Sequence, residues 1–429
     1  MPQAQEPYLA GRYTRCLSPL QPDTDVSTTA ANVPARPVLR LKHGEEHRIL
    51  AGHPWVFSNE VDTASTPLSG FASGETVVVE SARGRFLGHA YVNPHALICA
   101  RILSRQLEHP IGEKLIEHRL RVALALRARL AAGPHYRLVF GESDGLPGLV
   151  LDRYGDVVVG QIATAGMQAL APQVEAAVRE VLAPAVLYWK NDSGARELEQ
   201  LPADAYAAFG SAPEALEVEE SGARFLAPLE SGQKTGWFYD QSANRTRMLR
   251  YLPAQARVLD VCSYVGAWAI TALRAGARAA TCIDSSQPAL DYAARNAQAN
   301  ALALECVRAD AFDALRDLHV RSERFDAVIL DPPAFIKRKK DLAKGVAAYR
   351  KLNQLALALI ERDGLLVSCS CSYHLPEGEL MAAVQAGARH FGRFVQVLES
   401  GGQSPDHPVH PAIPETRYLK ALFCRVTRE

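Results

Sequence analysis

The chain has 429 residues and a formal net charge of zero, with 48% hydrophobic and 22% charged residues. This length exceeds that of a single hydrophobic core, so we expect two or three domains. The balanced charge indicates neither the presence nor the absence of a nucleic-acid partner, so local charge has to decide.

Eight cysteines are scattered through the sequence without any CxxC pair. Zinc sites and disulfide frameworks use regular cysteine spacing, so we expect no metal and no disulfides, but reduced thiols in the cytoplasm. No apolar run of about 18 residues occurs, which predicts that the chain does not span a membrane. The first residues also lack the apolar core of a signal peptide.

Residues 1–36 are rich in Pro, Ser, Thr and Asp and show hardly any hydrophobic periodicity, which predicts a disordered extension. Residues 37–115 then hold short strand-like runs separated by Gly and Asn-Pro, as in a small β domain. These runs are VLRL (38–41), ETVVVES (75–81), RFLGHAYV (85–92) and ALICARIL (96–103). Cations such as Arg48 precede Trp55 and Phe57, which suits RNA binding. A solvated rim around a core tryptophan explains the same pattern equally well.

Apolar residues at helical spacing over 111–132 predict a long helix, so we assign residues 116–136 to a linker helix. Residues 137–225 read as a middle α+β domain, with a helix near 171–182 followed by the strand VLYWK. From residue 226 to 429 strands and helices alternate, which predicts an α/β domain with a parallel, doubly wound sheet and helices on both faces.

In this last region, four successive apolar strands end in or near an aspartate: Asp260, Asp284, Asp310 and Asp331. Ligands of open α/β sheets bind at the carboxyl ends of the strands, so this series predicts a shared cofactor crevice. The loop CSYVGAW (262–268) has one glycine, Gly266, rather than GxGxxG, and no P-loop occurs. Such a loop is poorly suited to a pyrophosphate and admits a ligand without phosphates, such as S-adenosylmethionine.

Two of these strands carry further chemistry. The run FDAVILDPPAF ends on Asp331 and two prolines, and LLVSCSCS ends on Cys369 and Cys371. If both strands are parallel, a carboxylate and a thiol emerge at one edge of the sheet, which suggests methyl transfer to a nucleobase. The basic loop IKRKKDLAKG follows directly and fits phosphate contacts around a flipped nucleotide.

Further motifs are GESDGLPGLVLDRYG (141–155), GQKTGWFYDQSANR (232–245), VLDVCSYVGAWA (258–269) and DHPV (406–409). With DPPAF and SCSCS, they resemble the ribosomal RNA large-subunit methyltransferase I family over about nine-tenths of the chain. The resemblance implies a class I (Rossmann-like) methyltransferase with a seven-stranded sheet, preceded by a PUA domain. It also implies S-adenosylmethionine as cofactor, 5-methylcytosine as product, and 23S ribosomal RNA or a large-subunit precursor as partner.

The resemblance also implies roles for individual residues. Cys371 would be the nucleophile, because it lies between two serines as in the family, whereas Cys369 would pack in the core. Asp331 would bind the target base. The expected cofactor contacts are Asp260 and Gly266 at the methionine portion, Asp284 at the ribose, Asp310 at the adenine, and Lys234, Thr235 and Gln241 from the GQKTGWFYDQ segment. The expected RNA contacts are Pro332, Pro333, Phe335, Lys337, Arg338, Lys339 and Lys340.

Carbon 5 of cytosine is a weak nucleophile, and thiolate attack at carbon 6 activates it. The base that later removes the carbon-5 proton is not identified by the sequence. Two other functions stay open: an RNA methyltransferase acting on guanine or an exocyclic amine without a cysteine, and a non-catalytic RNA-binding assembly factor. The sequence also leaves open whether the protein forms a homodimer.

Overall fold

The computed structural model describes residues 36–428, so the extension predicted for residues 1–36 lies outside the described residues except for Arg36. After it, five short strands form a sheet in the order β1-β3-β4-β5-β2. Their inward residues, such as Val77 and Val79, fill a core of their own. The elements are β1 (Val38–Arg40), α1 (His47–Leu50), β2 (Trp55–Phe57), β3 (Thr76–Glu80), β4 (Phe86–Val92) and β5 (Ile98–Ser104). The predicted small β domain is therefore confirmed as a β structure.

The middle region begins with α2 (Glu113–Leu130), the long helix predicted from hydrophobic spacing. It packs against α4 (Ala171–Leu182) beside a second five-stranded sheet of order β10-β9-β8-β7-β6. That sheet consists of β6 (His135–Phe140), β7 (Leu149–Tyr154), β8 (Val157–Ile162), β9 (Val186–Asn191) and β10 (Asp204–Phe209). β8 and β9 are parallel because α3 (Ala165–Ala169) and α4 form the crossover between them. A hairpin of β11 (Ala215–Glu220) and β12 (Ala223–Pro228) follows.

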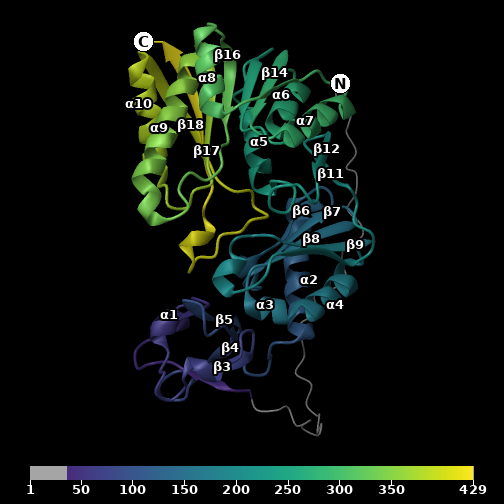
Figure 1. The fold of residues 1–429 in the computed structure, drawn as a ribbon, viewed down its shortest axis with the longest axis vertical. Coiled ribbons are helices and arrows are strands. Elements are labelled where there is room, and N and C mark those ends of the chain that lie inside the picture. Colours follow the sequence, from purple (N-terminus) through teal and green to yellow (C-terminus); the bar gives the residue numbers. More distant parts are fainter. Residues whose placement is uncertain (1–35, 429) are drawn as a thin grey trace, which may run out of the picture. The chain divides into compact units, whose positions relative to one another are not determined.

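The C-terminal region contains a seven-stranded sheet in the order β15-β14-β13-β16-β17-β19-β18 (Figure 1). Its strands are β13 (Arg257–Val261), β14 (Ala279–Asp284), β15 (Glu305–Arg308), β16 (Phe325–Leu330), β17 (Ile360–Ser370), β18 (Arg393–Gly401) and β19 (Lys420–Arg428). Its helices are α5 (Ser242–Met248), α6 (Ala267–Arg274), α7 (Gln287–Ala299), α8 (Ala311–Val320), α9 (Leu342–Leu359) and α10 (Glu377–His390). This is the predicted class I methyltransferase architecture.

Alternate residues of each strand enter different cores, as the period of two in a strand requires. In β13, Leu259 and Val261 pack in the core under α8, α9 and α10. Val258 packs with Trp268 of α6 on the opposite face. The helices thus cover both faces of the sheet, with α9 and α10 side by side on one of them (Figure 1).

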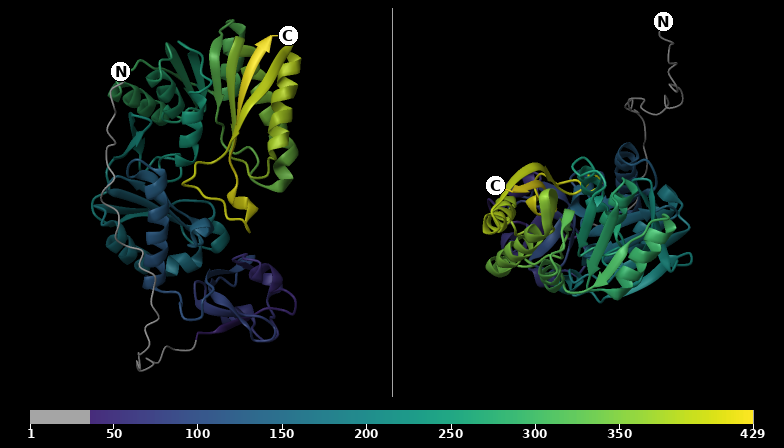
Figure 2. Two further views of the ribbon diagram at one scale, coloured as in Figure 1. Left: turned by 180° about the vertical axis from the view of Figure 1, so that it is seen from behind. Right: turned by 90° about the horizontal axis from the view of Figure 1, so that it is seen from above.

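β19 departs from the expected all-parallel sheet, because it runs antiparallel to both β17 and β18. No helix of crossover length lies between β18 and β19, so the chain turns back and enters the sheet in the opposite direction. Figure 2 shows this yellow C-terminal strand beside the green strands.

The described residues from Pro37 onward form one compact unit, so the finer domain boundaries at residues 115, 136 and 225 stay a prediction. No helix in the described part of the chain is long and apolar enough to cross a membrane.

Candidate active site

A cavity of about 380 Å³ opens at the carboxyl edge of the seven-stranded sheet. Its walls come from the loops that follow five neighbouring strands, β13 to β17, and from the segment 233–245, which runs into the first turn of α5. Its volume lies in the usual range for small-molecule sites. Of the four strand-end aspartates in the predicted series, Asp284, Asp310 and Asp331 line this cavity.

The loop after β13 forms one wall through an unusual backbone. Cys262, Tyr264 and Gly266 all have positive φ angles, of 62°, 50° and 80°. A Cβ at Gly266 would lie 3.1 Å from the Cβ of Ala293, so glycine allows α6 to begin close to α7. Cys262 and Tyr264 line the cavity.

Asp260 lies beneath this loop and does not line the cavity. Its side chain is completely buried and accepts a hydrogen bond from the backbone N–H of Ala269 at 3.1 Å. Burial raises the pKa of Asp260 to about 8. This residue fixes the start of α6, so any influence on a cofactor passes through the loop that it supports.

Asp284 and Asp310 both line the cavity, and both also hold backbone in place. Asp284 accepts hydrogen bonds from the N–H groups of Tyr264 and Ser286, each at 2.9 Å. Asp310 caps α8 by accepting from the N–H of Phe312 at 2.9 Å. Helix capping therefore accounts for part of the aspartate pattern, while cofactor contacts for these two carboxylates stay a prediction.

Asp331 emerges from β16 into the cavity with both carboxylate oxygens occupied. Gln241 Nε2 donates to Oδ1 at 2.9 Å, and Trp268 Nε1 donates to Oδ2 at 3.0 Å. Burial raises the pKa of Asp331 to about 6. The following residues Pro332, Pro333 and Phe335 also line the cavity.

The two thiols of the SCSCS segment occupy different environments. Cys369 is buried in the core beside α6, whereas Cys371 follows the end of β17 and lines the cavity. The serines on either side of Cys371 both bond to the Tyr349 hydroxyl, at 2.9 Å for Ser370 and 3.0 Å for Ser372. These bonds to α9 fix the segment that presents the Cys371 thiol.

Charges of both signs act on the Cys371 thiol. Burial raises its pKa, Lys234 lowers it, and Asp331 raises it. Cys262 also lines the cavity, but burial and the charges of Asp284 and Asp331 all raise the pKa of that thiol. Of the two, Cys371 is better placed to form a thiolate.

The GQKTGWFYDQ segment reaches the cavity through two of its three predicted residues. Lys234 and Gln241 line it, with Lys234 Nζ 3.8 Å from Asp240 Oδ2. Thr235 is completely buried and instead donates a hydrogen bond to Asp152 of β7. Its side chain therefore connects this segment to the middle sheet.

The predicted RNA-binding cations are exposed, and none of them lines the cavity. They follow Phe335 directly, and Arg338 pairs with Asp341 at 3.1 Å. The set is Lys337, Arg338, Lys339 and Lys340. Near the N-terminus, Arg48 pairs with Glu60 at 2.7 Å and the Trp55 indole donates to Glu142, which favours the structural explanation of that cation–aromatic pattern.

Two residues near the thiol were missed by sequence reasoning. Asp240 lines the cavity, and its neighbour Gln241 in the motif was the available signal. Lys420 donates to the backbone oxygens of Ser372 and Tyr418, and burial lowers its pKa to about 8. The sequence contained no pattern that would place Lys420 at the site, because its proximity to Cys371 depends on the antiparallel pairing of β17 with β19.

Comparison with known proteins gives the family. Ribosomal RNA large subunit methyltransferase I of Klebsiella pneumoniae subsp. pneumoniae is 36% identical over 398 residues, which are 91% of this chain and 98% of the relative. The chain belongs to the ribosomal RNA large subunit methyltransferase I family. The member from Salmonella arizonae is also 36% identical, over 93% of this chain and its own full length.

Other comparisons agree with this family's architecture. A PUA-like domain family matches residues 39–105, and the family called Conserved hypothetical protein 95 matches residues 246–373. Two solved structures have the same fold at 21% sequence identity, and each is covered in full by 91% of this chain. One, with a TM-score of 0.77, is described as a methyltransferase complexed with SAH. The other, from Streptococcus mutans, is described as a SAM-dependent methyltransferase and has a TM-score of 0.75.

Proposed function

We propose that this protein methylates carbon 5 of a cytosine in large-subunit (23S) ribosomal RNA, using S-adenosylmethionine and a covalent bond to Cys371. The observation that carries the cytosine assignment is the position of Cys371, which shares the cavity with Asp331 while Cys369 is buried. Membership of the family supports large-subunit ribosomal RNA as the substrate. We infer a cytoplasmic location, which this substrate and the free thiols of the described residues support.

The cavity fits the cofactor in its charge and size. It carries four carboxylates, which suit the ammonium and sulfonium groups of S-adenosylmethionine, and the loop 262–266 need not hold a phosphate. The acids are Asp240, Asp284, Asp310 and Asp331. Asp284 would hold the ribose, Asp310 the adenine, and Lys234 and Gln241 would close over the cofactor. When bound, the cofactor supplies a methyl group on a sulfonium.

The protein's own residues activate the pyrimidine. The Cys371 thiolate attacks carbon 6, and the electron pair of the 5,6 double bond moves so that carbon 5 becomes enamine-like and accepts the methyl group. Asp331 is fixed by Gln241 and Trp268, so it meets the pyrimidine ring without reorganising. Its pKa of about 6 allows it to share a proton with ring nitrogen 3 as negative charge develops there.

Covalent trapping tests this function. RNA carrying 5-fluorocytosine cannot lose a proton from carbon 5, so the wild-type protein should form a stable protein–RNA adduct that depends on S-adenosylmethionine. Cys371→Ala should abolish both the adduct and 5-methylcytosine formation, as measured by denaturing gel and nucleoside mass spectrometry.

Cys369→Ala and Cys262→Ala serve as matched controls, because each removes a neighbouring thiol from the same sheet edge. Both should still form the adduct. Full methylation by Cys371→Ala, or a methylated guanine in place of 5-methylcytosine, would contradict the proposal and favour chemistry without a nucleophilic cysteine.

A further inference from the structure

Asp240 is a buried carboxylate with an unpaired oxygen at the wall of the proposed active site. It belongs to the short turn η5 (Tyr239–Gln241), lines the cavity and is 4% exposed. The Tyr418 hydroxyl donates to Oδ2 at 2.5 Å, whereas Oδ1 is buried without a hydrogen-bond partner in the described part of the chain. Buried polar atoms are normally paired, so an unpaired carboxylate oxygen at a cavity wall indicates a ligand atom.

The other acids that line the cavity differ from Asp240 in their hydrogen bonds or in their exposure. Both oxygens of Asp331 accept side-chain hydrogen bonds, and both oxygens of Asp284 accept backbone hydrogen bonds. Asp310 is exposed and caps α8. Among the acids that line this cavity, Asp240 is therefore the buried one that can accept a proton without giving up an existing bond.

Asp240 also lies close to the nucleophile. The negative charges of Asp240 and Asp331 both raise the pKa of the Cys371 thiol. Lys234 Nζ lies 3.8 Å from Asp240 Oδ2. In a cytosine adduct, carbon 5 is bonded directly to the carbon that carries the cysteine sulfur. A base that removes the carbon-5 proton must therefore lie in this part of the cavity.

We propose that Asp240 is the general base that removes the carbon-5 proton after methylation, an inference that rests on the proposed cytosine-5 function. Oδ1 takes the proton, and the electron pair of the carbon–hydrogen bond forms the 5,6 double bond. The bond between carbon 6 and Cys371 Sγ breaks, and its electron pair leaves on sulfur as the thiolate. The products are 5-methylcytosine, free Cys371 and a protonated Asp240, which loses its proton to solvent.

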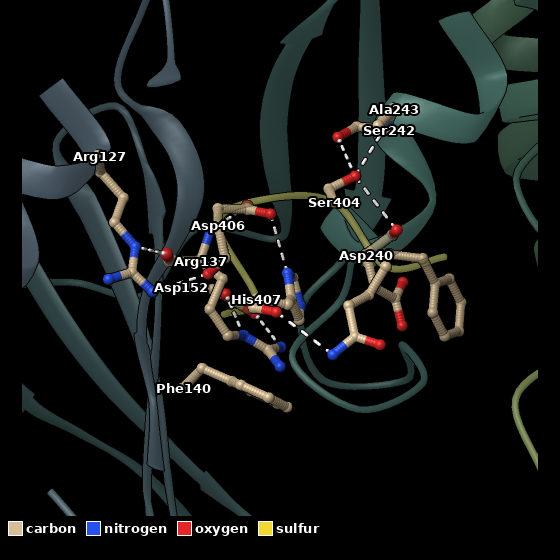
Figure 3. Close-up of polar contacts among 12 residues, drawn as sticks. Arg127, Arg137, Phe140, Asp152, Asp240, Ser242, Ala243, Ser404, Asp406 and His407 are labelled. Carbon is tan, nitrogen blue, oxygen red and sulfur yellow. Dashed lines mark hydrogen bonds and ion pairs between the residues drawn. The ribbon is translucent and has the colours of Figure 1, made fainter. Parts of the chain in front are cut away.

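The surroundings of Asp240 keep it ionised and fixed. Burial raises the pKa of Asp240, but the charges of Lys234 and His407 and the Tyr418 hydrogen bond outweigh it and lower the pKa to about 2. Ser404 donates to the backbone oxygen of Asp240 (Figure 3). The carboxylate is thus available at neutral pH, and recovery of the aromatic ring drives the proton transfer to it.

The test separates methyl transfer from proton removal. Asp240→Asn and the wild type react with RNA that contains [5-³H]cytosine, and tritium release, methyl incorporation and protein–RNA adduct are measured in a single turnover. General bases contribute about 10²–10⁴-fold, so tritium release by Asp240→Asn should slow at least about a hundredfold. A methylated adduct to Cys371 should accumulate on ordinary cytosine RNA.

Tyr418→Phe is the matched control, because it removes the hydrogen bond to Asp240 but leaves the carboxylate. It should release tritium in proportion to the methyl group transferred, and calorimetry with S-adenosylhomocysteine should show that both variants keep a folded cavity. Tritium release by Asp240→Asn that keeps pace with methyl transfer would overturn the base assignment, even if its cofactor affinity falls. If the wild type releases no tritium and forms no adduct with 5-fluorocytosine RNA, the cytosine function itself fails.

Discussion

At the scale of single residues, the reactivity of the site depends on how much of Cys371 is thiolate. Burial raises the pKa of this half-buried thiol, and the carboxylates of Asp331 and Asp240 act in the same direction. Lys234 opposes them, and the cation of Lys420 also interacts with the Cys371 thiolate. The free enzyme should therefore hold Cys371 mainly as the thiol at neutral pH, with the thiolate fraction increasing as pH rises.

Alkylation by iodoacetamide measures this fraction directly. The rate at Cys371, followed by peptide mass spectrometry, should rise about tenfold per pH unit between pH 7 and 9 without a plateau, because the thiolate is the reacting form. Lys234→Met should raise the pKa further and so slow the reaction at pH 8, because a smaller fraction of Cys371 is then thiolate. Lys351→Met, an exposed cation outside the cavity, should change nothing. A plateau below pH 8 would contradict the stated pKa direction.

At the scale of elements, the sequence predicted the strands and helices of the C-terminal region well, because hydrophobic runs of strand length alternate there with amphipathic helices. It also predicted that Asp284, Asp310, Asp331 and Cys371 share one edge, since parallel strands end together. It did not show that Asp260 points toward α6. Which face a strand residue occupies depends on packing partners that are distant in sequence.

Long-range pairing explains the other differences. The antiparallel course of β19 brings Lys420 behind Cys371, and the fold of the 233–245 segment brings Asp240 to the cavity and Thr235 to Asp152. Local propensity has no information about such contacts. The sequence thus predicts the edge of the sheet on which the chemistry lies, while the loops that complete it need the structure.

The basic loop after Phe335 should contribute to RNA affinity but not to the methyl-transfer reaction. Replacing Lys337, Lys339 and Lys340 by Ala should reduce the slope of log Kd against log salt by about two to three, because each phosphate contact releases close to one counterion. The measurement is filter binding of a large-subunit ribosomal RNA fragment. The control replaces three exposed arginines at the opposite edge of the sheet, Arg321, Arg362 and Arg389. Equal slopes for both triple variants would remove the loop from the RNA interface.

At the scale of the whole molecule, hydrogen bonds from two buried arginines of the middle region, Arg127 and Arg137, hold Asp406 of the C-terminal region (Figure 3). Arg127 of α2 is completely buried, pairs with Asp144 and donates to the backbone oxygen of Asp406 at 2.7 Å. Asp406 in turn accepts from the N–H of Arg137 at 2.9 Å and contacts His407. The DHPV segment is therefore held by the middle region, while the neighbouring Ser404 holds Asp240.

Loss of Arg127 should destabilise the chain as a whole. Arg127→Ala leaves Asp144 buried without its partner, so the free energy of unfolding in urea should fall by about 3–5 kcal/mol. Arg121→Ala on the same helix removes an exposed pair with Glu117, and its cost should stay below about 1 kcal/mol. Similar losses for the two variants would show that the buried connection does not stabilise the protein.

The proposed cytosine-5 function depends on which nucleotide is modified. Bisulfite sequencing of large-subunit ribosomal RNA from cells that lack this protein, and from the same cells carrying the wild-type chain or Cys371→Ala, tests it most directly. We expect that one 5-methylcytosine is lost, returns with the wild-type chain and does not return with Cys371→Ala. An unchanged set of 5-methylcytosines in the cells that lack the protein would contradict the cytosine-5 function.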